Sequence, residues 1–493
     1  MIQTVKDLAE LIRHYYGHRA VRERILEFLG QSPIDHPSAV YVCGTDGGSD
    51  PCRLELLPVF RLNEFLGRDC EIGRSLWDRQ FLIADLDIDY ENFDSAVEPY
   101  LNANRIFQIL QPVVKAAISI LGVTGIQPLH LLGGRGHHLV WAIRRDSRAF
   151  GQLADLGHVP LSLMALYERK AIEFGETIDL RLARAFAGLG MLLEFVAHSI
   201  LSMAPPHCSV PIQLTAVEVG PINGRREIVS LDISEYGDPF HLRHIRVPFS
   251  LYLKLRSLTW CLGQDGVRQL LPLFEIPLGD MSLEDALRVR CDPQAVVDLA
   301  TKSSVRIPDE SEESLNLLLE YKKSDLASHH QDFHSDQLQL GSGTKSGVNS
   351  YQPKILPPCA RWILEHPNDW LLKPGGVQHV TRTLMALGWP SRQIADLVRT
   401  QYNGDFGWND RWLRYDAAWR AMFYVRLFSG LIEAGKDQLI DFNCVSHKEK
   451  GYCPIAECGW NLVPYQEALI RRRQHGELEN RPVDRLLLEG KDF

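Results

Sequence analysis

The stretch FLIADLDIDY, residues 81–90, decides how the first half of this sequence is interpreted. Its first four residues are apolar and predict a buried β-strand, and Asp85, Asp87 and Asp89 follow at alternate positions. Because strand side chains alternate between two faces, the three carboxylates are expected to point the same way. Like charges at this spacing repel one another, so a cation is expected between them. An edge strand whose acids face water is the alternative.

The composition is that of a water-soluble globular protein. The chain has 493 residues, 45% of them hydrophobic and 23% charged, with a net charge of −9. This length is enough for about two to four domains. The start, MIQTVKDLAELIRHYY, lacks the apolar block of a signal peptide, and we find no uninterrupted apolar run of membrane-spanning length. We therefore expect a cytoplasmic protein without a membrane partner, in which a local basic groove can still bind nucleic acid.

A second motif, LLGGRGHHLVWAI at residues 131–143, has the composition of a phosphate-binding turn. Its three glycines permit a tight turn with exposed backbone N–H groups. Arg135 and His138 lie in that turn and at the start of the next strand, where a guanidinium and an imidazole can meet phosphate oxygens. The alternative is an ordinary β-hairpin with a surface histidine pair.

A third motif, SLDISEYGDPFHLRHIRVPFSLYLK, covers residues 230–254. Asp232 ends an apolar strand, and Arg246, Ser250 and Lys254 recur at every fourth residue. Basic groups here could neutralise a triphosphate, although an ordinary surface segment is the alternative. Two carboxylates on one strand face and a third from elsewhere can hold two divalent cations, an arrangement that suits phosphoryl transfer.

In this order, the three motifs resemble those of the archaeo-eukaryotic primase superfamily, over residues 35–260. That family has an apolar strand with two acids, a Gly- and Arg-rich loop whose histidine opens a strand, and an acid-ending strand that leads into a segment similar to HLRHIRVPFSLYLK. The resemblance implies the primase fold, with mixed sheets and flanking helices, and nucleotidyl transfer with Mg²⁺ or Mn²⁺. The metal ligands that it implies are Asp85, Asp87 and Asp232, and the nucleotide contacts are Arg135, His138, Arg246, Ser250 and Lys254.

The sequence departs from the family pattern at two positions. Leu132 takes the place of the usual loop serine, which removes a hydroxyl contact, and Tyr252 stands where the family often has histidine. The register of the acids is also open, because Asp87 and Asp89 form a second D-x-D pair. We prefer Asp85 and Asp87, which lie closest to the apolar run.

The last third of the chain contains a group of four cysteines, Cys359, Cys444, Cys453 and Cys458. In a cytosolic chain such a group predicts a metal before a disulfide. Four thiolates suit either Zn²⁺ or a [4Fe–4S] cluster. A local zinc site in which His447 replaces Cys359 is one alternative, and four unrelated cysteines are another.

The segments PPCARWIL, GGVQHVTRTLMALGW and YCP, within residues 353–465, resemble the iron–sulfur domain of the primase large subunit. The resemblance implies a [4Fe–4S] cluster, and a domain that binds the template and the 5′ end of the primer. Arg361, His379 and Arg382 are the positions that it implies for phosphate contacts. For the two arginines, a plain helix surface is the alternative.

The sequence therefore predicts an α+β protein in which a primase catalytic core is followed by a mostly α-helical, cysteine-rich metal domain. Residues 301–352 are polar and rich in Ser, Gly and His, which is typical of a linker, with a short helix at 314–323. The expected order is a helical N-terminal segment, 1–34; a catalytic domain, 35–300; the polar linker, 301–352; the metal domain, 353–470; and a C-terminal tail, 471–493.

The expected function is that of a DNA primase or primase-polymerase, an enzyme that joins nucleotides along single-stranded DNA and releases pyrophosphate. Its expected partners are the template, nucleoside triphosphates, and proteins of replication, of a mobile element or of a defence system such as a CRISPR-associated one. A metal-dependent nuclease is one alternative, because water could replace the 3′-hydroxyl as nucleophile. A non-catalytic module that binds single-stranded nucleic acid is the other, and it would bind DNA whether or not divalent ions are present.

Overall fold

The computed structural model describes residues 5–32, 36–47, 54–159, 163, 178–215, 226–237, 244–335, 356–367, 371, 373–402, 417–455 and 457–475. By its internal contacts the chain divides into a first unit, Met1–Ile212 with Ile228–Leu318, and a second unit, Gln213–Glu227 with Leu319–Phe493. The described residues form two β-sheets and many helices, so the α+β class is confirmed.

The larger sheet has six strands in the order β10-β5-β6-β4-β8-β7. Its strands are β4 (Phe81–Asn92), β5 (Leu129–Leu132), β6 (Gly136–Arg144), β7 (Ile212–Leu214), β8 (Glu227–Asp232) and β10 (Ile276–Pro277). The acidic stretch is part of β4, which pairs antiparallel with β6 so that Asp87 lies opposite His138. Because β6 and β8 flank β4 on its two sides, the alternative of an edge strand is wrong.

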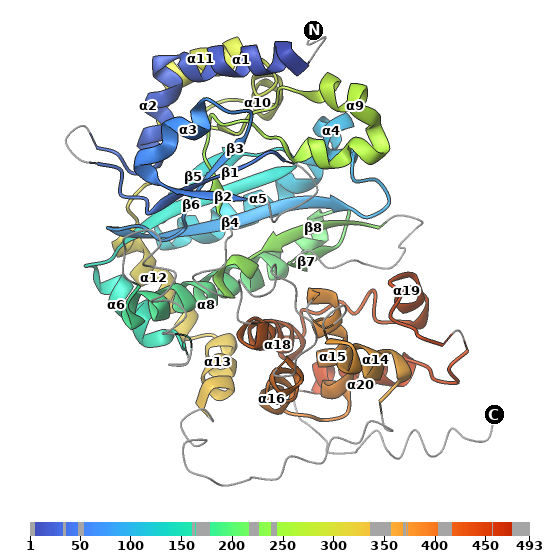
Figure 1. The fold of residues 1–493 in the computed structure, drawn as a ribbon. Coiled ribbons are helices and arrows are strands. Elements are labelled where there is room, and N and C mark those ends of the chain that lie inside the picture. The colour runs from blue at the N-terminus through green and yellow to red at the C-terminus, as the bar shows by residue number, and fades with distance from the viewer. Residues whose placement is uncertain are drawn as a thin grey trace. The chain divides into compact units, whose positions relative to one another are not determined.

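Helices α5 (Ala103–Thr124) and α8 (Leu180–Met203) pack against this sheet and against each other (Figure 1). Both are long and apolar enough to cross a membrane by length and composition alone. In this fold, however, α5 contacts β4 and β6, and α8 contacts β4 and α6 (Arg148–Leu156). The most apolar window of α8 is 72% buried, as in the core helix of a soluble protein.

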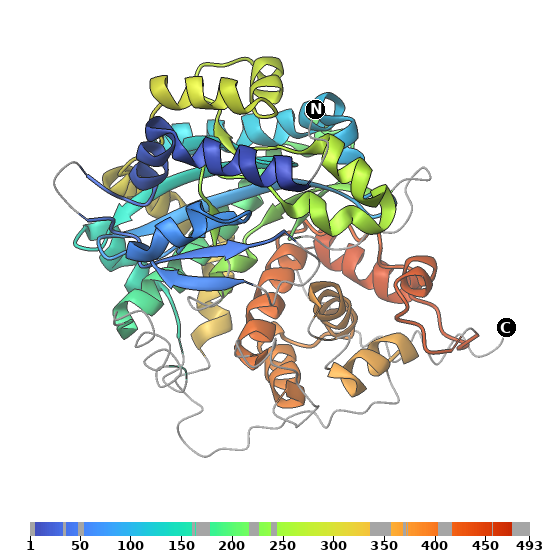
Figure 2. The ribbon, with the colours of Figure 1, turned by 45° about the horizontal axis from the view of Figure 1, so that its top comes forward.

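The smaller sheet has the order β2-β1-β3-β9. Its strands are β1 (Tyr41–Thr45), β2 (Glu55–Pro58), β3 (Glu71–Arg74) and β9 (Ile245–Arg246), and the helices around it include α1 (Val5–Gly17), α2 (Arg19–Phe28), α3 (Leu62–Leu66) and α11 (Pro293–Lys302). α1 and α11 both pack on α2, although they are far apart in the sequence (Figures 1 and 2). α1 is tied to the third motif, since the Tyr15 hydroxyl donates to the carbonyl of Phe249 at 2.9 Å. The N-terminal helices are therefore part of the first unit.

Shorter elements complete the first unit. They are α4 (Glu98–Leu101), α9 (Thr259–Leu270) and α10 (Leu283–Val289), with 3₁₀ helices η2 (Val59–Arg61), η4 (Pro205–His207), η5 (Ser234–Gly237) and η6 (Lys254–Leu258). η5 and η6 both belong to the third motif, where the sequence pattern alone predicted no helix.

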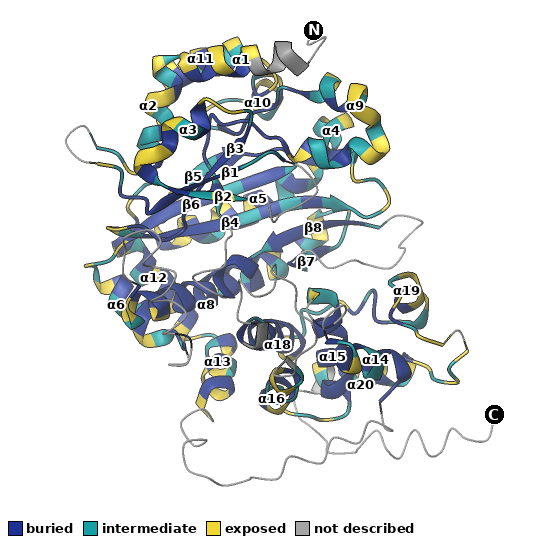
Figure 3. Cartoon of the chain, viewed as in Figure 1, coloured by how far each residue is buried: buried dark blue, intermediate teal, exposed yellow. Residues whose placement is uncertain are grey.

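The second unit is helical, as the sequence predicts for residues 353–470. Its helices are α13 (Asp325–Ser335), α14 (Pro358–Glu365), α15 (Pro374–Ala386), α16 (Ser391–Tyr402), α18 (Ala417–Glu433), α19 (Cys444–Glu449) and α20 (Val463–His475). α15 packs against α14, α16, α18 and α20, and every residue from Gly376 to Ala386 is buried. Figure 3 shows α15 in dark blue for this reason.

The expected linker is wrong for the part of residues 301–352 that the structure describes. The short helix expected at 314–323 is present as α12 (Ser311–Lys322), and α13 follows it directly. Both helices bury apolar side chains at helical spacing, namely Leu317, Leu318, Tyr321, Leu326 and Phe333. Polar composition concealed this pattern, and residues 336–352 lie outside the described residues, as does the tail from 476 onward.

Candidate active site and cysteine cluster

His138 on β6 lies between two of the aspartates on β4. Its Nδ1 atom is 3.2 Å from each carboxylate oxygen of Asp85 and 3.9 Å from Oδ1 of Asp87. Residues that face each other on antiparallel strands point to the same side of a sheet, so the pairing of Asp87 with His138 produces this contact. Strand geometry alone therefore brings the first and second motifs together.

The histidine is held in its charged form by these carboxylates. The side chains of Asp85 and His138 are 1% and 14% exposed. Burial lowers the pKa of His138, but the neighbouring Asp85 and Asp87 carboxylates outweigh it and raise that pKa well above its ordinary value. At neutral pH the imidazolium neutralises part of the negative charge on this face of the sheet.

Asp87 has an incomplete set of partners. Its Oδ1 atom is buried and has no hydrogen-bond partner. Burial raises its pKa well above the ordinary value, the Asp89 charge raises it further, and Asp85 and Asp232 add to the same effect. The group therefore lies where negative charge is concentrated, and a bound cation would relieve that concentration.

The structure brings Asp232, from the third motif, into this neighbourhood. Asp232 ends β8, the strand next to β4, and its charge acts on Asp87. Four residues later, the hydroxyl of Tyr236 accepts a 2.7 Å hydrogen bond from the backbone N–H of Asp85. The Asp232 carboxylate itself accepts a 3.0 Å bond from the N–H of Ser234. The three aspartates that the sequence singled out thus share one region of the first unit.

Asp89 is occupied by an ion pair with the glycine-rich loop. Nε of Arg135 donates to Asp89 at 2.7 Å, and Nη2 of Arg135 donates to Glu91 at 2.6 Å. Burial raises the pKa of Asp89, but Arg135 and Lys254 outweigh it, and the net direction is down. This pairing favours Asp85 and Asp87 over Asp87 and Asp89 as the reactive pair. It also means that Arg135 braces the loop through two carboxylates.

The loop before β6 is held by residues that the motifs did not point to. The guanidinium of Arg290 is buried and donates to the carbonyls of Gly133 and Gly134. A Cβ atom at Gly134 would lie 2.3 Å from the ring of Tyr252, so only glycine fits there. The Tyr252 hydroxyl in turn is 2.9 Å from that of Tyr100. Tyr252 is therefore packed under the loop.

The basic residues of the third motif have different surroundings. Arg246 donates to Glu71 at 3.2 Å and to Glu275 at 3.3 Å, and its guanidinium lies over the Tyr252 ring. Ser250 is fully buried and donates to a backbone carbonyl at 3.3 Å, so the expectation that its hydroxyl binds nucleotide is not supported.

Lys254 is exposed beside the acids. Partial desolvation and the neighbouring Arg135 charge lower its pKa, while Glu91 and Asp89 act in the opposite direction. Among the basic residues of the third motif that the structure describes, it is the most exposed.

Glu275 is a site residue that sequence reasoning missed. Its side chain is fully buried, Oε2 pairs with Arg246, and Oε1 has no hydrogen-bond partner. Burial raises the pKa of Glu275. The charges of His138 and Arg246 lower this pKa, and the charge of Asp85 raises it, so that the net direction is up. The signal in the sequence was a lone acid within the apolar segment LPLFEIPLG. Such an acid needs a buried partner, but the pattern does not say which.

The alternative of a surface histidine pair in the second motif is wrong. His137 is fully buried on the opposite face of β6 from His138, because neighbouring strand residues alternate. Its Nδ1 atom is 2.8 Å from Nε2 of His130, and its ring contacts Phe107 of α5. Burial lowers the pKa of His137 well below its ordinary value and that of His130 to about 4. Both rings are therefore neutral, His137 in the core and His130 at its edge.

The acidic centre, formed by Asp85, Asp87 and Asp232, has the type of ligand atom that divalent cations bind. Asp85, Asp87 and Asp232 supply carboxylate oxygens, which Mg²⁺ and Mn²⁺ prefer, and Oδ1 of Asp87 has no hydrogen-bond partner. In the part of the chain that the structure describes, no group of three or more His, Cys, Asp or Glu residues is arranged to hold a metal ion. The case for a metal ion here therefore depends on the carboxylate ligands and on Oδ1 of Asp87, which lacks a hydrogen-bond partner.

In the second unit, three of the four cysteines interact. The hydrogen bond to Cys453 raises the pKa of Cys359, burial raises it further, and the Cys444 charge adds to this. The Cys458 thiol has another contact, with the carbonyl of Trp460 at 3.9 Å. Cys359 and Cys453 thus share a hydrogen bond, and the charge of Cys444 reaches Cys359. Thiols suit zinc and iron–sulfur clusters alike, although the described residues here, too, contain no group of three arranged to hold a metal ion.

Two buried histidines extend this group. Nε2 of His379 is 3.3 Å from the Cys359 sulfur, and Nδ1 of His379 is 2.8 Å from Nε2 of His447. Nδ1 of His447 is 2.7 Å from the carbonyl of Asn443, so it is the donor there. Burial lowers the pKa of His379 well below its ordinary value and that of His447 to about 4. Because His447 faces His379, the local zinc site that would include it is disfavoured.

These contacts correct two of the expected primer-binding residues. His379 is 1% exposed and lies in the histidine chain described above. Arg382 is 2% exposed and donates to Asp437 at 2.6 and 2.7 Å and to Asp441 at 2.8 Å. Neither side chain is presented to a phosphate, because burial and protein partners occupy both. Arg361, by contrast, has a side chain that is 35% exposed.

No protein-family model, curated protein or solved structure matches this chain. The fold and site are therefore defined by their own geometry. They show an α+β first unit with a buried carboxylate–histidine centre, and a helical second unit with a thiol–imidazole cluster.

Proposed function

We propose that this chain is a DNA primase or primase-polymerase, a nucleotidyltransferase that builds primers on single-stranded DNA. The observation that carries the proposal is the convergence of Asp85, Asp87 and His138 on one face of the larger sheet, with Asp232 close enough for its charge to act on Asp87. These groups come from three motifs whose order resembles that of the archaeo-eukaryotic primase superfamily.

The acids would hold Mg²⁺ or Mn²⁺, which activates a 3′-hydroxyl and neutralises the triphosphate in this type of reaction. The chain's own residues supply position and charge. His138, kept protonated by Asp85, can donate a hydrogen bond to a phosphate oxygen through its remaining N–H. Lys254 provides an exposed ammonium group next to the acids.

Arg135 and Arg246 support the site through neighbouring carboxylates, and this is a role the motifs alone did not suggest. Each guanidinium is shared between two acids, Asp89 and Glu91 for Arg135 and Glu71 and Glu275 for Arg246. Their positive charge is therefore partly neutralised before any nucleotide arrives. We assign them to the placement of the loop and of Tyr252, with direct phosphate contact left to His138 and Lys254.

The second unit is proposed to hold a [4Fe–4S] cluster, with Zn²⁺ as the alternative, through Cys359, Cys444, Cys453 and Cys458. Three of these thiols interact, which supports a shared site. Its proposed role is to bind the template and the 5′ end of the primer, with Arg361 as the exposed candidate for phosphate contact. Replication, a mobile element or a defence system are the settings in which such an enzyme acts.

Synthesis on an unprimed single-stranded template tests this function. Ribo- and deoxynucleotides are supplied separately, with Mg²⁺ or Mn²⁺, and new strands are resolved on a denaturing gel. New strands that require a divalent ion and are lost in the Asp85→Asn/Asp87→Asn variant are expected. Shortening of the template would indicate a nuclease. DNA binding without synthesis, and indifferent to divalent ions, would indicate a non-catalytic module.

A further inference from the structure

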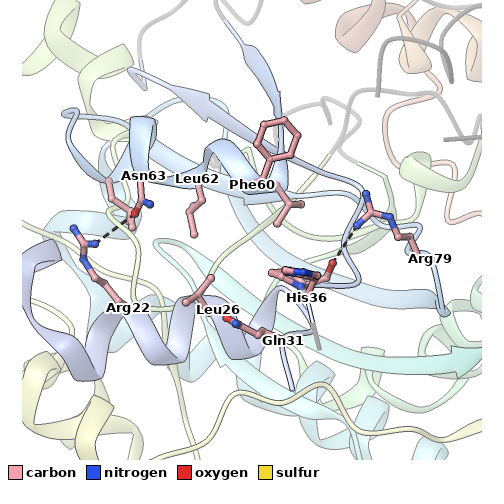
Figure 4. Close-up of a pocket in the computed structure, with 11 residues that line it drawn as sticks. Arg22, Leu26, Gln31, His36, Phe60, Leu62, Asn63 and Arg79 are labelled. Atoms are coloured by element: carbon pink, nitrogen blue, oxygen red, sulfur yellow. Dashed lines mark hydrogen bonds between the residues drawn. The ribbon is translucent and has the colours of Figure 1, made fainter. Parts of the chain in front are cut away.

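A pocket of about 500 Å³ lies in the first unit, between α2, the segment at residues 36–37, and the η2–α3 turn (Figure 4). None of its lining residues belongs to the acidic centre. Its volume falls in the range of sites for small molecules, roughly 300–1,000 Å³. The motifs that define the proposed activity leave this pocket without a role.

One wall of the pocket is apolar and includes an aromatic side chain that is exposed to solvent. Leu26, Val59 and Leu62 contribute aliphatic surface, and Phe60 stands beside them. Phe60 is 83% exposed, whereas its neighbour Val59 is 6% exposed. An exposed ring next to a concave apolar surface is a platform on which a flat ligand can stack.

Apart from Pro37 and Leu66, the rest of the described lining is basic or polar. Arg22 and Arg79 lie at opposite ends of the row of side chains in Figure 4, and no described lining residue is acidic, although the chain has a net charge of −9. Nε of Arg22 donates to the carbonyl of Tyr16 at 2.6 Å, and Nη1 donates to Asn63 at 3.4 Å. These partners are neutral, so they orient the Arg22 guanidinium without cancelling its charge.

A ligand that matches this lining has a flat ring, hydrogen-bonding groups on the ring edge and negative charge on both sides. The side chains of Asn63, Gln31 and His36 can form hydrogen bonds with the edge of such a ring. A nucleotide inside a strand has this chemistry, because its base is flanked by one phosphate on the 5′ side and another on the 3′ side. A free nucleotide carries its phosphates on one side only.

We propose that the pocket binds one nucleotide of a single-stranded nucleic acid, with its base against Phe60 and its flanking phosphates at Arg22 and Arg79. The proposal rests on the proposed function and deepens it, since it names a place on the first unit that the template strand contacts. Aromatic stacking combined with basic groups is the usual physical basis of sequence-independent single-strand binding.

Binding of a fluorescein-labelled oligodeoxythymidylate to the full-length protein tests this, measured by fluorescence anisotropy over a series of salt concentrations. Phe60→Ala is expected to weaken binding roughly tenfold or more, through loss of stacking, and Phe60→Trp is expected to retain it. Arg79→Ala and Arg22→Ala are each expected to reduce the slope of log K against log salt by about 0.7, because one phosphate contact is lost.

Matched controls are exposed residues of the first unit outside the pocket. Val123 is 83% exposed and Arg288 has a side chain that is 79% exposed, so Val123→Ala removes an exposed apolar group and Arg288→Ala an exposed guanidinium. Both are expected to bind the oligonucleotide like the unmodified protein. Phe60 and Arg79 are themselves exposed, so their variants are expected to melt at the same temperature as the controls.

The outcomes separate this proposal from the proposed function. If the unmodified protein binds and synthesises DNA, and the Phe60 and arginine variants bind as the controls do, the pocket assignment is overturned and the function stands. If these variants weaken binding but no synthesis occurs with any nucleotide, the pocket stands and the primase fails. If they change the binding of free dTTP and not of the oligonucleotide, or if the unmodified protein binds no single strand, the strand assignment is overturned.

Discussion

The imidazole of His138 lies 3.2 Å from both carboxylate oxygens of Asp85, on the neighbouring strand of a six-stranded sheet. Two residues that are 53 positions apart thereby form one buried unit of opposite charge. Oδ1 of Asp87 lies 3.9 Å from the Nδ1 atom of the same ring and has no hydrogen-bond partner. This arrangement leads to specific expectations for stability as well as for activity.

Asp87→Asn should abolish DNA synthesis and at the same time stabilise the fold. The folded-state pKa of Asp87 is raised, so its charge opposes folding at neutral pH. That penalty is absent when pH is below the pKa of about 4 in the unfolded chain, where the group is protonated in both states. Urea unfolding is expected to show a gain on the order of 1 kcal/mol at pH 7 that disappears toward pH 4.

The same variant tests for a bound ion. Mg²⁺ or Mn²⁺ is expected to raise the melting temperature of the unmodified protein, because an ion that binds only the folded state stabilises it. Asp87→Asn should lose this effect. Asp146→Asn, at an exposed ion pair at the end of β6, serves as the control and should keep it. An equal thermal shift in Asp87→Asn would remove Asp87 from the proposed metal site.

His138→Gln should destabilise the protein most at low pH. The pKa of His138 is raised in the folded state, so its stabilising contribution is complete below about pH 6.5, the ordinary value of the unfolded chain. It is lost as pH rises through the raised pKa. The difference in unfolding free energy between the two proteins should be about 1.5–3 kcal/mol near pH 6, the range for a charged hydrogen bond. A difference that instead grew from pH 6 to pH 9 would contradict the assignment of a charged imidazole.

Glu275→Ala should destabilise the first unit by up to roughly 3–5 kcal/mol, since it leaves the partly buried guanidinium of Arg246 with one of its two acids. Glu275→Gln keeps an oxygen that can accept from Arg246 and should cost less. Asp265→Ala removes an acid from an exposed pair with Arg268 and should have little effect. Chemical unfolding of the three variants checks this order, and equal costs for Glu275→Ala and Asp265→Ala would refute it.

Arg382→Ala should reduce the stability of the protein, whereas Arg361→Ala should reduce its binding of nucleic acid. Arg382 is buried between Asp437 and Asp441, so its removal is expected to cost roughly 3–5 kcal/mol in the second unit. Arg361 is partly exposed, so its removal should leave the melting temperature unchanged and weaken the binding of a primed template. A stable Arg382→Ala protein with weakened primer binding would instead restore the direct phosphate contact that the resemblance implied.

Removal of cysteines should identify the metal of the second unit. Protein purified without oxygen is expected to be brown, with broad visible absorption, and to contain four iron atoms per chain, the stoichiometry of a [4Fe–4S] cluster. Cys359→Ser and Cys453→Ser should lose the colour, whereas Cys261→Ser, at an exposed thiol of α9, should keep it. Colourless protein with one zinc per chain would show the alternative metal. Metal content unchanged in Cys359→Ser would exclude Cys359 from the site.

Much of the acidic centre could be predicted because it depends on strand periodicity. Alternation predicted that Asp85, Asp87 and Asp89 share one face, whereas the pairing of β4 with β6, which sets His138 opposite Asp87, came from the structure. The helical second unit was predicted for a similar reason, since apolar residues recur at helical spacing. The same reasoning predicted a short helix where α12 lies but missed α13, in which polar residues outnumber the few apolar ones that the helix buries.

Other features depended on partners from distant parts of the chain. Glu71 and Glu275 both form ion pairs with Arg246, although they are far from it in the sequence. The local sequence around these residues does not predict either pair. Arg382 looked like a surface arginine because its two acids follow 55 and 59 residues later. Tertiary packing decides whether a charged side chain faces a ligand or a buried counter-ion. Local periodicity in the sequence does not predict this.

The sequence by itself determined the strands of the motifs, the shared face of the three acids on β4 and the α+β class, because these follow from local backbone geometry. Tertiary structure decided which charged groups are occupied by protein partners and which remain open, such as Oδ1 of Asp87. The physical reason is that burial makes an unpaired charge costly, so each buried charge is matched by whichever groups the fold brings beside it.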